Sequence, residues 1–449
     1  MKKLIVELPS EVRIILYTLN KAGHEGYIVG GCVRDALMGR IPEDWDITTS
    51  ATPDIVKGIF PKTYDTGLKH GTVTVRVNSK NYEITTYRVE GDYKDYRRPS
   101  CVEFVRDIAL DLGRRDFTMN AIAYHPNEGF IDPYQGMEDI NDGIIRSVRD
   151  PQERFTEDAL RILRGVRFSA QLGFKIEEET LAGMLKCAHL LGHISMERIR
   201  EEMMKILLSD RPEKLMDMYH WDLLQYVLPE LIACFDTPQN HPHHSYNVGI
   251  HTIKAVQQMP KDPAIRLAML LHDIGKPPTH TRDKKGIDHF YGHVPLGAKM
   301  SKEILRRLRF DNETIRQVTT LVEYHDFHIE KKLTRNSIKD VLCRIGEELF
   351  EKLLAIQEAD ARAQNPHKLA PKLQVLEETR VVYKEIIASE ECYTIRDLAI
   401  DGKDIASLGI KPGRQVGALL EKALQYVIKY PDQNNKQQLL EMIKEHHIK

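Results

Sequence analysis

The apolar residues of this 449-residue chain change their spacing once, near Pro151. Before that point, short apolar runs such as YIVGG, GTVTVRV and YEITTYRV lie between turn residues and alternate with helix-like segments, a pattern typical of a mixed α/β unit. After it, segments such as FTEDALRILRGVRFSAQLG and MERIREEMMKILLS repeat apolar residues at i, i+3, i+4 and i+7, the spacing of an amphipathic helix. The sequence therefore predicts an α+β protein with a mixed sheet in its N-terminal part and only helices beyond it.

The length and the turn residues divide the chain further. A chain of this size is expected to form several domains. Loops rich in Pro, Gly and His interrupt the helical part at PQNHPHHS and at KPPTHTRDKKGIDH. We predict four regions, namely a mixed α/β unit, a helical neck, a histidine-rich helical region and a helical tail, at residues 1–150, 151–215, 216–390 and 391–449.

Composition excludes several classes of protein. No apolar run approaches the roughly 18 residues of a membrane span, and Glu7 and Glu11 interrupt the apolar stretch that a signal peptide needs, so we expect a cytoplasmic protein without a membrane anchor. The six cysteines are far apart and form no C-x-x-C pair, which predicts reduced, structural thiols. Because the net charge is −2, a nucleic-acid partner must be inferred from motifs and not from a basic composition.

Two glycines and two aspartates form the strongest local signal in the α/β unit. The apolar run Tyr27–Val29 leads into Gly30 and Gly31 and then into a helix. The free backbone N–H groups of such a turn suit a phosphate, although most Gly-Gly pairs are only tight turns. Asp44 and Asp46 are two apart in a strand-like segment, so both side chains point to the same face. Carboxylates on one face repel each other unless a cation binds between them, which favours a Mg²⁺ site; the alternative is an acidic, solvent-facing edge.

Two further motifs in this unit carry charged or amide side chains. Glu83, in the strand-like run YEITT, could complete the metal site as a ligand or as the base for an attacking hydroxyl. In RRDFTMN, the guanidinium groups of Arg114 and Arg115 can hold triphosphate oxygens, and the amide of Asn120 can hold a ribose hydroxyl. The alternative for the second motif is an Arg–Asp helix cap beside a surface pair.

The segment from Glu157 to Arg164 is predicted to be helical, with charged residues on one face. Glu157, Arg161 and Arg164 are three or four apart, and so are Asp158 and Arg161. A solvated salt bridge is the simple interpretation of this spacing, and a binding face is the alternative. Further along, Ser195 is placed as the N-cap of the next helix.

Histidine and aspartate recur in the region 216–390, at His251, His272, Asp273, His293, His325 and Asp326. A lone histidine is usually a core or surface residue, but imidazoles beside an aspartate suit divalent cations such as Mn, Ni, Fe or Mg. The segment LAMLLHDIGKP resembles the metal-binding core of the HD phosphohydrolase domain, and the histidines before and after it lie where outer ligands of that family would be. This resemblance implies an HD-type domain with a second divalent metal, and it leaves open whether that domain is active.

The remaining motifs resemble, in order and spacing, those of the class II tRNA nucleotidyltransferase and bacterial poly(A) polymerase family. They are GGCVRDALMG, DWDITT, EITTYR, RRDFTMNA, DPYQGMEDI and RFTEDALRILRGVRF, and the match is close over about residues 25–215. The resemblance implies a nucleotidyltransferase palm at 1–150, in which Asp44 and Asp46 bind catalytic Mg²⁺ and Glu83 assists. It also implies that Asp158 and Arg161 read the base. The full set of nucleotide-binding residues that it implies is Gly30, Gly31, Arg34, Arg115, Asp116, Asn120, Asp158, Arg161 and Arg164. The helix that begins at Ser195 would brace the base-reading helix.

The function that this resemblance implies is addition of C, C and A to the 3′ end of tRNA from CTP and ATP, with the tail binding tRNA. The sequence leaves open two relatives, an enzyme that adds only A and a poly(A) polymerase; the near-neutral EHHIK terminus favours the polymerase least. The polar segment between Glu90 and Cys101 resembles a mobile loop that is shortened in enzymes adding only CC. Two other classes are alternatives. One is a non-catalytic RNA-binding or nucleotide-sensing protein, which the presence of Asp44, Asp46 and Glu83 disfavours, and the other is a phosphohydrolase that acts through the HD-type domain.

Overall fold

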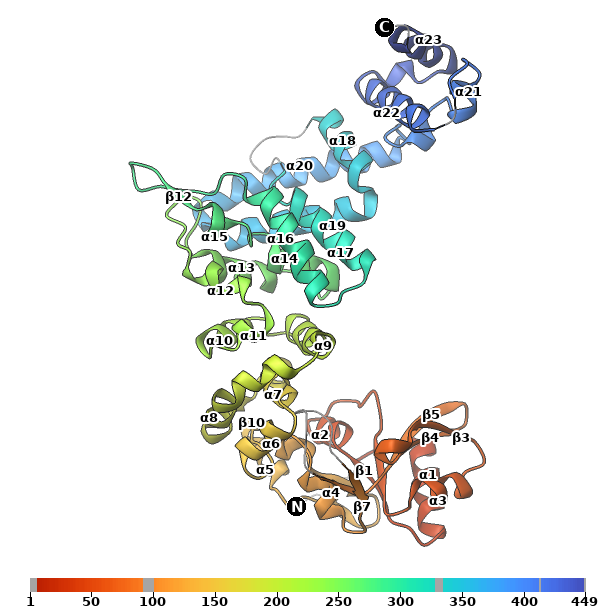
Figure 1. The fold of residues 1–449 in the computed structure, drawn as a ribbon, viewed down its shortest axis with the longest axis vertical. Coiled ribbons are helices and arrows are strands. Elements are labelled where there is room, and N and C mark those ends of the chain that lie inside the picture. Colours follow the sequence, from red (N-terminus) through yellow and green to blue (C-terminus); the bar gives the residue numbers. More distant parts are fainter. Residues whose placement is uncertain (1–5, 92–100, 328–333, 412, 448–449) are drawn as a thin grey trace. The chain divides into compact units, whose positions relative to one another are not determined.

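The computed structural model describes residues 6–91, 101–327, 334–411 and 413–447. The chain divides into two compact units, Met1–Pro229 and Glu230–Lys449, drawn in red to yellow-green and in green to blue in Figure 1. Most of the loop predicted between Glu90 and Cys101 lies outside the described residues. The division into four regions stays a prediction.

A seven-stranded mixed sheet forms the body of the first unit, with the strand order β3-β4-β5-β2-β1-β8-β9. Strands β2 and β5 run parallel, and the other neighbouring strands are antiparallel. The strands are β1 Gly26–Val29, β2 Ile47–Thr49, β3 Thr63–Gly67, β4 Thr72–Val77, β5 Lys80–Thr86, β8 Ala123–His125 and β9 Gly129–Ile131. The apolar runs that predicted strands therefore correspond to β1, β2, β4 and β5.

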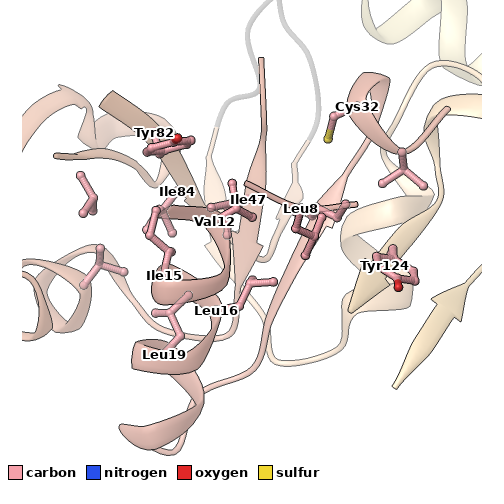
Figure 2. Packing of buried hydrophobic residues seen from close by; sticks show 14 of the residues in the cluster. Leu8, Val12, Ile15, Leu16, Leu19, Cys32, Ile47, Tyr82, Ile84 and Tyr124 are labelled. Atoms are coloured by element: carbon pink, nitrogen blue, oxygen red, sulfur yellow. The ribbon is translucent and has the colours of Figure 1, made fainter. Parts of the chain in front are cut away.

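Helix α1 (Ser10–Lys21) packs against this sheet through one apolar face. Val12, Ile15, Leu16 and Leu19 recur at helical spacing and are buried together with residues of the central strands, such as Ile47 (Figure 2). Burial of one aliphatic side chain of this size contributes about 2 kcal/mol to stability. This face therefore holds α1 on the sheet.

The rest of the first unit is mostly helical. Its helices are α2 Gly31–Leu37, α3 Pro53–Ile59, α4 Ile108–Gly113, α5 Gly136–Asp142, α6 Pro151–Glu157, α7 Leu160–Leu172, α8 Glu178–Cys187, α9 Met196–Leu207, α10 Lys214–His220 and α11 Leu224–Val227. Short 3₁₀ helices occur at Leu68–His70, Thr118–Asn120 and Ala188–His193. Two strand pairs lie outside the main sheet, the antiparallel β6 Arg88–Glu90 with β7 Val102–Phe104 and the parallel β10 Ile144–Ile145 with β11 Lys175–Ile176.

The predicted helix across Glu157–Arg164 is interrupted, which corrects the expectation that these residues share one helix face. Helix α6 ends at Glu157, and Asp158 has extended backbone angles, φ −139° and ψ 100°. The Asp158 carboxylate then accepts a hydrogen bond from the backbone N–H of Leu160, at the start of α7. The side chain thus competes with the helix for a backbone donor, as short acidic residues do at helix starts.

The second unit is built from helices and one short hairpin. The helices are α12 Glu230–Asp236, α13 Val248–Gln257, α14 Pro263–Leu271, α15 Lys276–Thr279, α16 His293–Arg307, α17 Asn312–Tyr324, α18 Arg335–Ile345, α19 Glu347–Ala363, α20 Leu369–Ala388, α21 Gly402–Ala406, α22 Arg414–Lys429 and α23 Lys436–His447. The hairpin pairs β12 Thr281–Arg282 with β13 Asp288–His289. Short 3₁₀ helices lie at Pro366–Lys368, Ile395–Asp397 and Pro431–Gln433.

The predicted α+β class is confirmed, with a mixed N-terminal sheet followed by a mostly helical remainder. The expectation that strands end before Pro151 is wrong in two places, at β11 and at the β12–β13 hairpin. These strands are two residues long, too short to produce a run of alternating apolar residues. Among the described residues, no helix combines the length and apolarity that crossing a bilayer requires.

Candidate active site and metal centre

Three carboxylates of the first unit face one cavity. In the parallel pair β2/β5, Ile47 lies opposite Ile84, so Asp46 and Glu83 each directly precede a paired residue and lie on the same face of the sheet. Asp44 lies in a bend before β2, which begins only at Ile47, so the expectation that Asp44 and Asp46 share a strand is wrong. All three line a cavity of about 590 Å³, whose other residues include Tyr64, Thr66 and Thr74.

The electrostatics of Asp46 favour a cation in this cavity. Although the side chain keeps contact with solvent, surrounding protein atoms desolvate the carboxyl and raise its pKa above the ordinary value, and the neighbouring charge of Asp44 adds to the increase. The guanidinium of Arg115 acts in the opposite direction. A divalent cation between the aspartates would offset both unfavourable effects, and carboxylate oxygens are suitable ligands for Mg²⁺.

Gly30 allows Arg115 to approach the backbone at the end of β1. Gly30 has φ +83°, and a Cβ atom at this position would lie 2.9 Å from Arg115 Nη1. Arg115 Nη2 is 3.7 Å from the buried carboxylate of Asp111, whereas its Nε is buried without a hydrogen-bond partner among the described residues. The glycine turn that predicted a phosphate site therefore places a guanidinium beside Gly30 and near Asp46.

Asp116 organises the side chains next to this guanidinium. Its Oδ2 accepts hydrogen bonds from Nε and Nη2 of Arg164 at 2.7 and 2.5 Å, and its Oδ1 accepts one from Asn120 Nδ2 at 3.1 Å. Burial alone would raise the pKa of Asp116, but the Arg164 charge and the Asn120 hydrogen bond hold that pKa far below its ordinary value. Asp116 is therefore ionised and fixes the orientation of Arg164 and Asn120.

Arg34 joins this network from helix α2. Its Nη1 donates to Asn120 Oδ1 at 2.7 Å, and its guanidinium carbon lies 5.1 Å from the centre of the Phe168 ring. Arg164 and Arg167 also lie over this ring, at 5.5 and 4.1 Å. Phe168 and Arg167 were not among the site residues predicted from sequence. An apolar and a basic residue on a helix do not by themselves indicate a binding site, and only the folded protein places the Phe168 ring among three guanidinium groups.

Asp158 and Arg161 bind different partners and do not pair with each other. Both oxygens of Asp158 accept hydrogen bonds from Arg198 of α9, at 3.1 and 2.8 Å. Arg161 donates to Glu157 Oε2 at 2.8 Å and to the backbone carbonyls of Arg154 and Arg114 at 3.2 and 2.9 Å. The simple alternative, a salt bridge between Asp158 and Arg161, is thus wrong: Asp158 is bound in a partly buried pair with Arg198, and Arg161 is bound to Glu157 and to backbone carbonyls. Ser195 is at the N-cap position of α9, as predicted.

The second unit brings the predicted histidines into one buried cluster and adds Asp360 to it. Ligand atoms of His251, His272 and Asp360 lie within 4.8 Å of one another, and so do those of Asp273, His293 and His325. Asp326 lines the adjoining cavity. Asp360 lies on α19 in the segment QEADARA, far along the chain from the other members and beside no histidine, so no local sequence pattern indicated it.

The imidazoles of this cluster are oriented like metal ligands. Their Nδ1 atoms contact backbone carbonyls, which leaves Nε2 to face the carboxylates; the distances are 2.7 Å for His272 and for His325, 2.9 Å for His293 and 3.4 Å for His251. Such contacts through the second nitrogen are typical of metal-bound histidines.

The polar atoms at the centre of the cluster converge without bonding one another. His251 Nε2 is 2.8 Å from Asp360 Oδ1 and His272 Nε2 is 3.1 Å from Asp273 Oδ2, yet within the described part of the chain neither nitrogen has a partner with hydrogen-bond geometry. Burial lowers the pKa of His325 to about 3, so this imidazole is neutral at neutral pH, as a ligand must be. This donor set fits a divalent cation.

Three family models match the chain in order. The poly A polymerase head domain matches residues 26–146, the RNA and SrmB-binding site of polymerase A matches 173–235, and the tRNA nucleotidyltransferase domain 2 matches 288–443. The first match contains the three carboxylates, Arg34, Asp116 and Asn120, and the third contains His293, His325 and Asp360 of the histidine cluster.

The chain is similar to CCA-adding enzymes, over nearly its full length in one case. A CCA-adding enzyme of Enterococcus faecalis is 33% identical over 445 residues, which are 98% of this chain and 96% of the relative. A CCA-adding enzyme of a Geobacillus species is 53% identical over 193 residues, 43% of this chain and 48% of the relative. Among solved structures, the Bacillus stearothermophilus CCA-adding enzyme in complex with CTP has a TM-score of 0.72 and 29% identity, covering 97% of each chain. The Thermotoga maritima CCA-adding enzyme complexed with tRNA has a TM-score of 0.58 at 19% identity, which is a likeness of fold.

Proposed function

This chain belongs to the CCA-adding enzyme family of tRNA nucleotidyltransferases, and we propose that it adds C, C and A to the 3′ end of tRNA from CTP and ATP. The observation that carries the proposal is the similarity over nearly the full length of the chain, combined with three carboxylates that line one cavity. The binding of CTP and of tRNA by related proteins supports the same substrates here.

The carboxylates Asp44 and Asp46 would hold the catalytic cation, which we propose to be Mg²⁺, with Glu83 as a further ligand or as the base. A divalent cation at this position stabilises the charge that develops on the transferred phosphoryl group. The raised pKa of Asp46 supports this assignment, because the cation would restore its ionised form. Glu83 lies beside Asp46 across the parallel strand pair, where an acceptor hydroxyl would have to be deprotonated.

The incoming nucleotide would bind next to these carboxylates, at the Gly30–Gly31 turn and the side chains around Asp116. Arg115, beside Gly30 and Gly31, is suited to the triphosphate because its buried Nε has no partner among the described residues. Asp116 accepts hydrogen bonds from Asn120 and Arg164, and Asn120 in turn accepts one from Arg34. These three side chains offer donors for ribose and phosphate oxygens.

Asp158 and Arg161 would select the base. Cytosine and adenine both present an exocyclic amine beside a ring nitrogen, so a carboxylate acceptor next to a guanidinium donor matches them. Guanine and uracil present a carbonyl beside an N–H and would leave these groups unpaired. Since Arg198 already binds both oxygens of Asp158, the amine would use the remaining lone pairs of that carboxylate.

One assay tests this function against its rivals. The purified protein is given tRNA that lacks its 3′ terminus, with each labelled nucleoside triphosphate in turn and then with mixtures. Addition of two C residues followed by one A is expected. Incorporation of A alone onto tRNA ending in CC would indicate an A-adding enzyme, long A tracts a poly(A) polymerase, and no incorporation a non-catalytic RNA-binding protein.

A second activity is proposed for the histidine cluster, hydrolysis of phosphate esters with a bound divalent metal. The convergence of His251, His272, Asp273 and Asp360 on one point supports it, because buried polar atoms are seldom left without hydrogen bonds unless an ion belongs there. Metal analysis of the purified protein and hydrolysis assays with Mn²⁺ or Ni²⁺ test the second activity.

We also propose a role for each of the four regions. Residues 1–150, 151–215, 216–390 and 391–449 would act as palm, base-reading neck, HD-type domain and tRNA-binding tail, respectively.

A further inference from the structure

A cavity of about 450 Å³ adjoins the histidine cluster of the second unit. Its lining includes Asp273, His325 and Asp360 of the cluster and also two lysines, Lys276 and Lys372. The lysines are only 7% and 9% exposed. Buried ammonium groups are rare unless a negative charge accompanies them, so the partners of these two residues are informative.

Lys276 has such a partner. Its Nζ lies 2.7 Å from Asp273 Oδ2 and donates to Gln239 Oε1 at 2.8 Å. The ammonium also lies over the Phe290 ring, 5.4 Å from its centre. The charge of Lys276 is therefore balanced within the protein.

Lys372 differs from Lys276 in this respect. Its Nζ donates to the amide oxygen of Gln364 at 2.5 Å, and among the described residues no carboxylate forms an ion pair with it. Gln364 in turn donates its Nε2 to Asp360 Oδ2 at 2.9 Å, which fixes the amide with its oxygen toward Lys372. The neutral amide of Gln364 thus lies between the buried ammonium of Lys372, whose charge no carboxylate balances among the described residues, and the carboxylate of Asp360 in the histidine cluster.

We infer that Lys372 binds the phosphoryl group of a phosphate ester in this cavity. The inference rests on the phosphohydrolase activity proposed above and names the residue, outside the metal ligands, that holds the substrate's negative charge. A phosphoryl group has several anionic oxygens, so it can contact a metal centre and an ammonium at the same time. A bound anion would also offset the unfavourable burial of the Lys372 charge.

The test measures binding of inorganic phosphate to the full-length protein by calorimetry, first without metal and then with Mn²⁺. Four variants are compared with the wild type. Lys372→Met removes the charge, Lys372→Arg keeps it, and Gln364→Glu gives Lys372 a carboxylate partner. Lys368→Met removes the charge of an exposed lysine four positions earlier, outside the cavity. Phosphate bound in the first unit contributes equally to all five proteins, because none of the substitutions lies there.

Loss of one charge-assisted hydrogen bond is expected to weaken phosphate binding about tenfold in Lys372→Met. Gln364→Glu should weaken it by a similar factor, because the new carboxylate would pair with the Lys372 ammonium in place of the phosphate. Lys372→Arg should stay within about threefold of the wild type, and Lys368→Met should match it. Wild-type affinity in Lys372→Met, or an equal loss in Lys368→Met, would overturn the inference. Melting curves of each variant report folding, and Gln364→Glu decides the outcome if Lys372→Met does not fold. A wild-type protein that binds no Mn²⁺ would overturn the phosphohydrolase proposal, whereas the metal-free titrations still decide the role of Lys372.

Discussion

Arg198 donates two hydrogen bonds to the carboxylate of Asp158, from Nη1 to Oδ1 at 3.1 Å and from Nη2 to Oδ2 at 2.8 Å. The bond pair connects α9 to the break between α6 and α7, and a two-point contact of this kind fixes the plane of the carboxylate. Any base that Asp158 recognises therefore meets an acceptor whose direction Arg198 has set.

Replacing Arg198 with Met should relax base selection. Because Asp158 loses its orientation, incorporation of UTP or GTP relative to CTP and ATP is expected to rise about tenfold, while KM for CTP changes less. Asp158→Ala and Arg161→Ala should relax selection at least as much, since they remove the base contacts themselves. Competition assays on truncated tRNA measure the ratios, and wild-type ratios in all three variants would refute the proposed base-reading pair.

Gly30→Ala should impair nucleotide addition more than it impairs folding. The added Cβ would lie 2.9 Å from Arg115 Nη1 and would displace that guanidinium. Gly39→Ala is the matched control, because Gly39 also has a positive φ, +72°, but a Cβ there meets nothing within 4 Å. Both variants should lose about 1–2 kcal/mol of stability from backbone strain, and only Gly30→Ala should show a raised KM for CTP. Equal KM values would contradict the proposed role of Arg115.

Asp116→Asn should destabilise the first unit in a pH-dependent way. A depressed folded-state pKa means that Asp116 stabilises the fold above its unfolded value, about 3.9, and that this stability is lost as pH falls toward the folded value. The variant leaves Arg164 without its buried partner, which should cost about 3–5 kcal/mol at pH 7. Denaturant unfolding at pH 7 and at pH 3.5 should show the difference between the proteins shrinking at the lower pH. A difference that does not depend on pH would contradict the ion pair.

Much of the first unit could be predicted from sequence because its signals are local. The continuous apolar run around Tyr27 and the partly alternating runs around Val73 and Ile84 are bounded by turn residues and so specify strands, and Asp46 and Glu83 come together because β2 and β5 pair in parallel. The break at Asp158 could not be predicted, because helical spacing of apolar residues continues on both sides of it. Only the long-range contact with Arg198 and the hydrogen bond to Leu160 make the break visible.

The histidine cluster illustrates the same limit. His272 and Asp273 are adjacent and form a recognisable motif, so they could be singled out from sequence. Asp360 reaches them only because α19 packs against α13 and α14, and no spacing rule connects an aspartate on one helix with histidines on others. Lys372 was missed for a related reason, since a lysine on a helix is usually solvated and its burial appears only in the folded protein.

Asp46→Asn should abolish nucleotide addition while leaving the fold intact. Removing one ligand from a shared metal site loses the cation that stabilises the transferred phosphoryl group, so the rate should fall at least about a hundredfold, roughly 2.7 kcal/mol on the barrier. Asp44→Asn should behave in the same way. Glu43→Gln is the control, because Glu43 is an adjacent exposed carboxylate outside the cavity of Asp44, Asp46 and Glu83. Single-turnover incorporation into truncated tRNA measures the effect, and a rate within tenfold of wild type would exclude the proposed metal role.

Asp360→Asn should separate the two proposed activities. Burial alone would raise the pKa of Asp360, but the imidazole of His251, whose Nε2 lies 2.8 Å from Asp360 Oδ1, holds that pKa well below its ordinary value, so the wild-type group is an ionised ligand candidate. The amide has no charge to offer a cation, and bound Mn²⁺ per protein should therefore fall severalfold, together with hydrolysis of phosphate esters. Glu348→Gln, which changes an exposed carboxylate of the same helix, should keep the metal. Addition of nucleotides to tRNA should be unchanged in both variants, because the carboxylates proposed for that reaction belong to the other unit. Metal retention in Asp360→Asn would remove Asp360 from the ligand set, and a parallel loss of nucleotide addition would contradict the independence of the two sites.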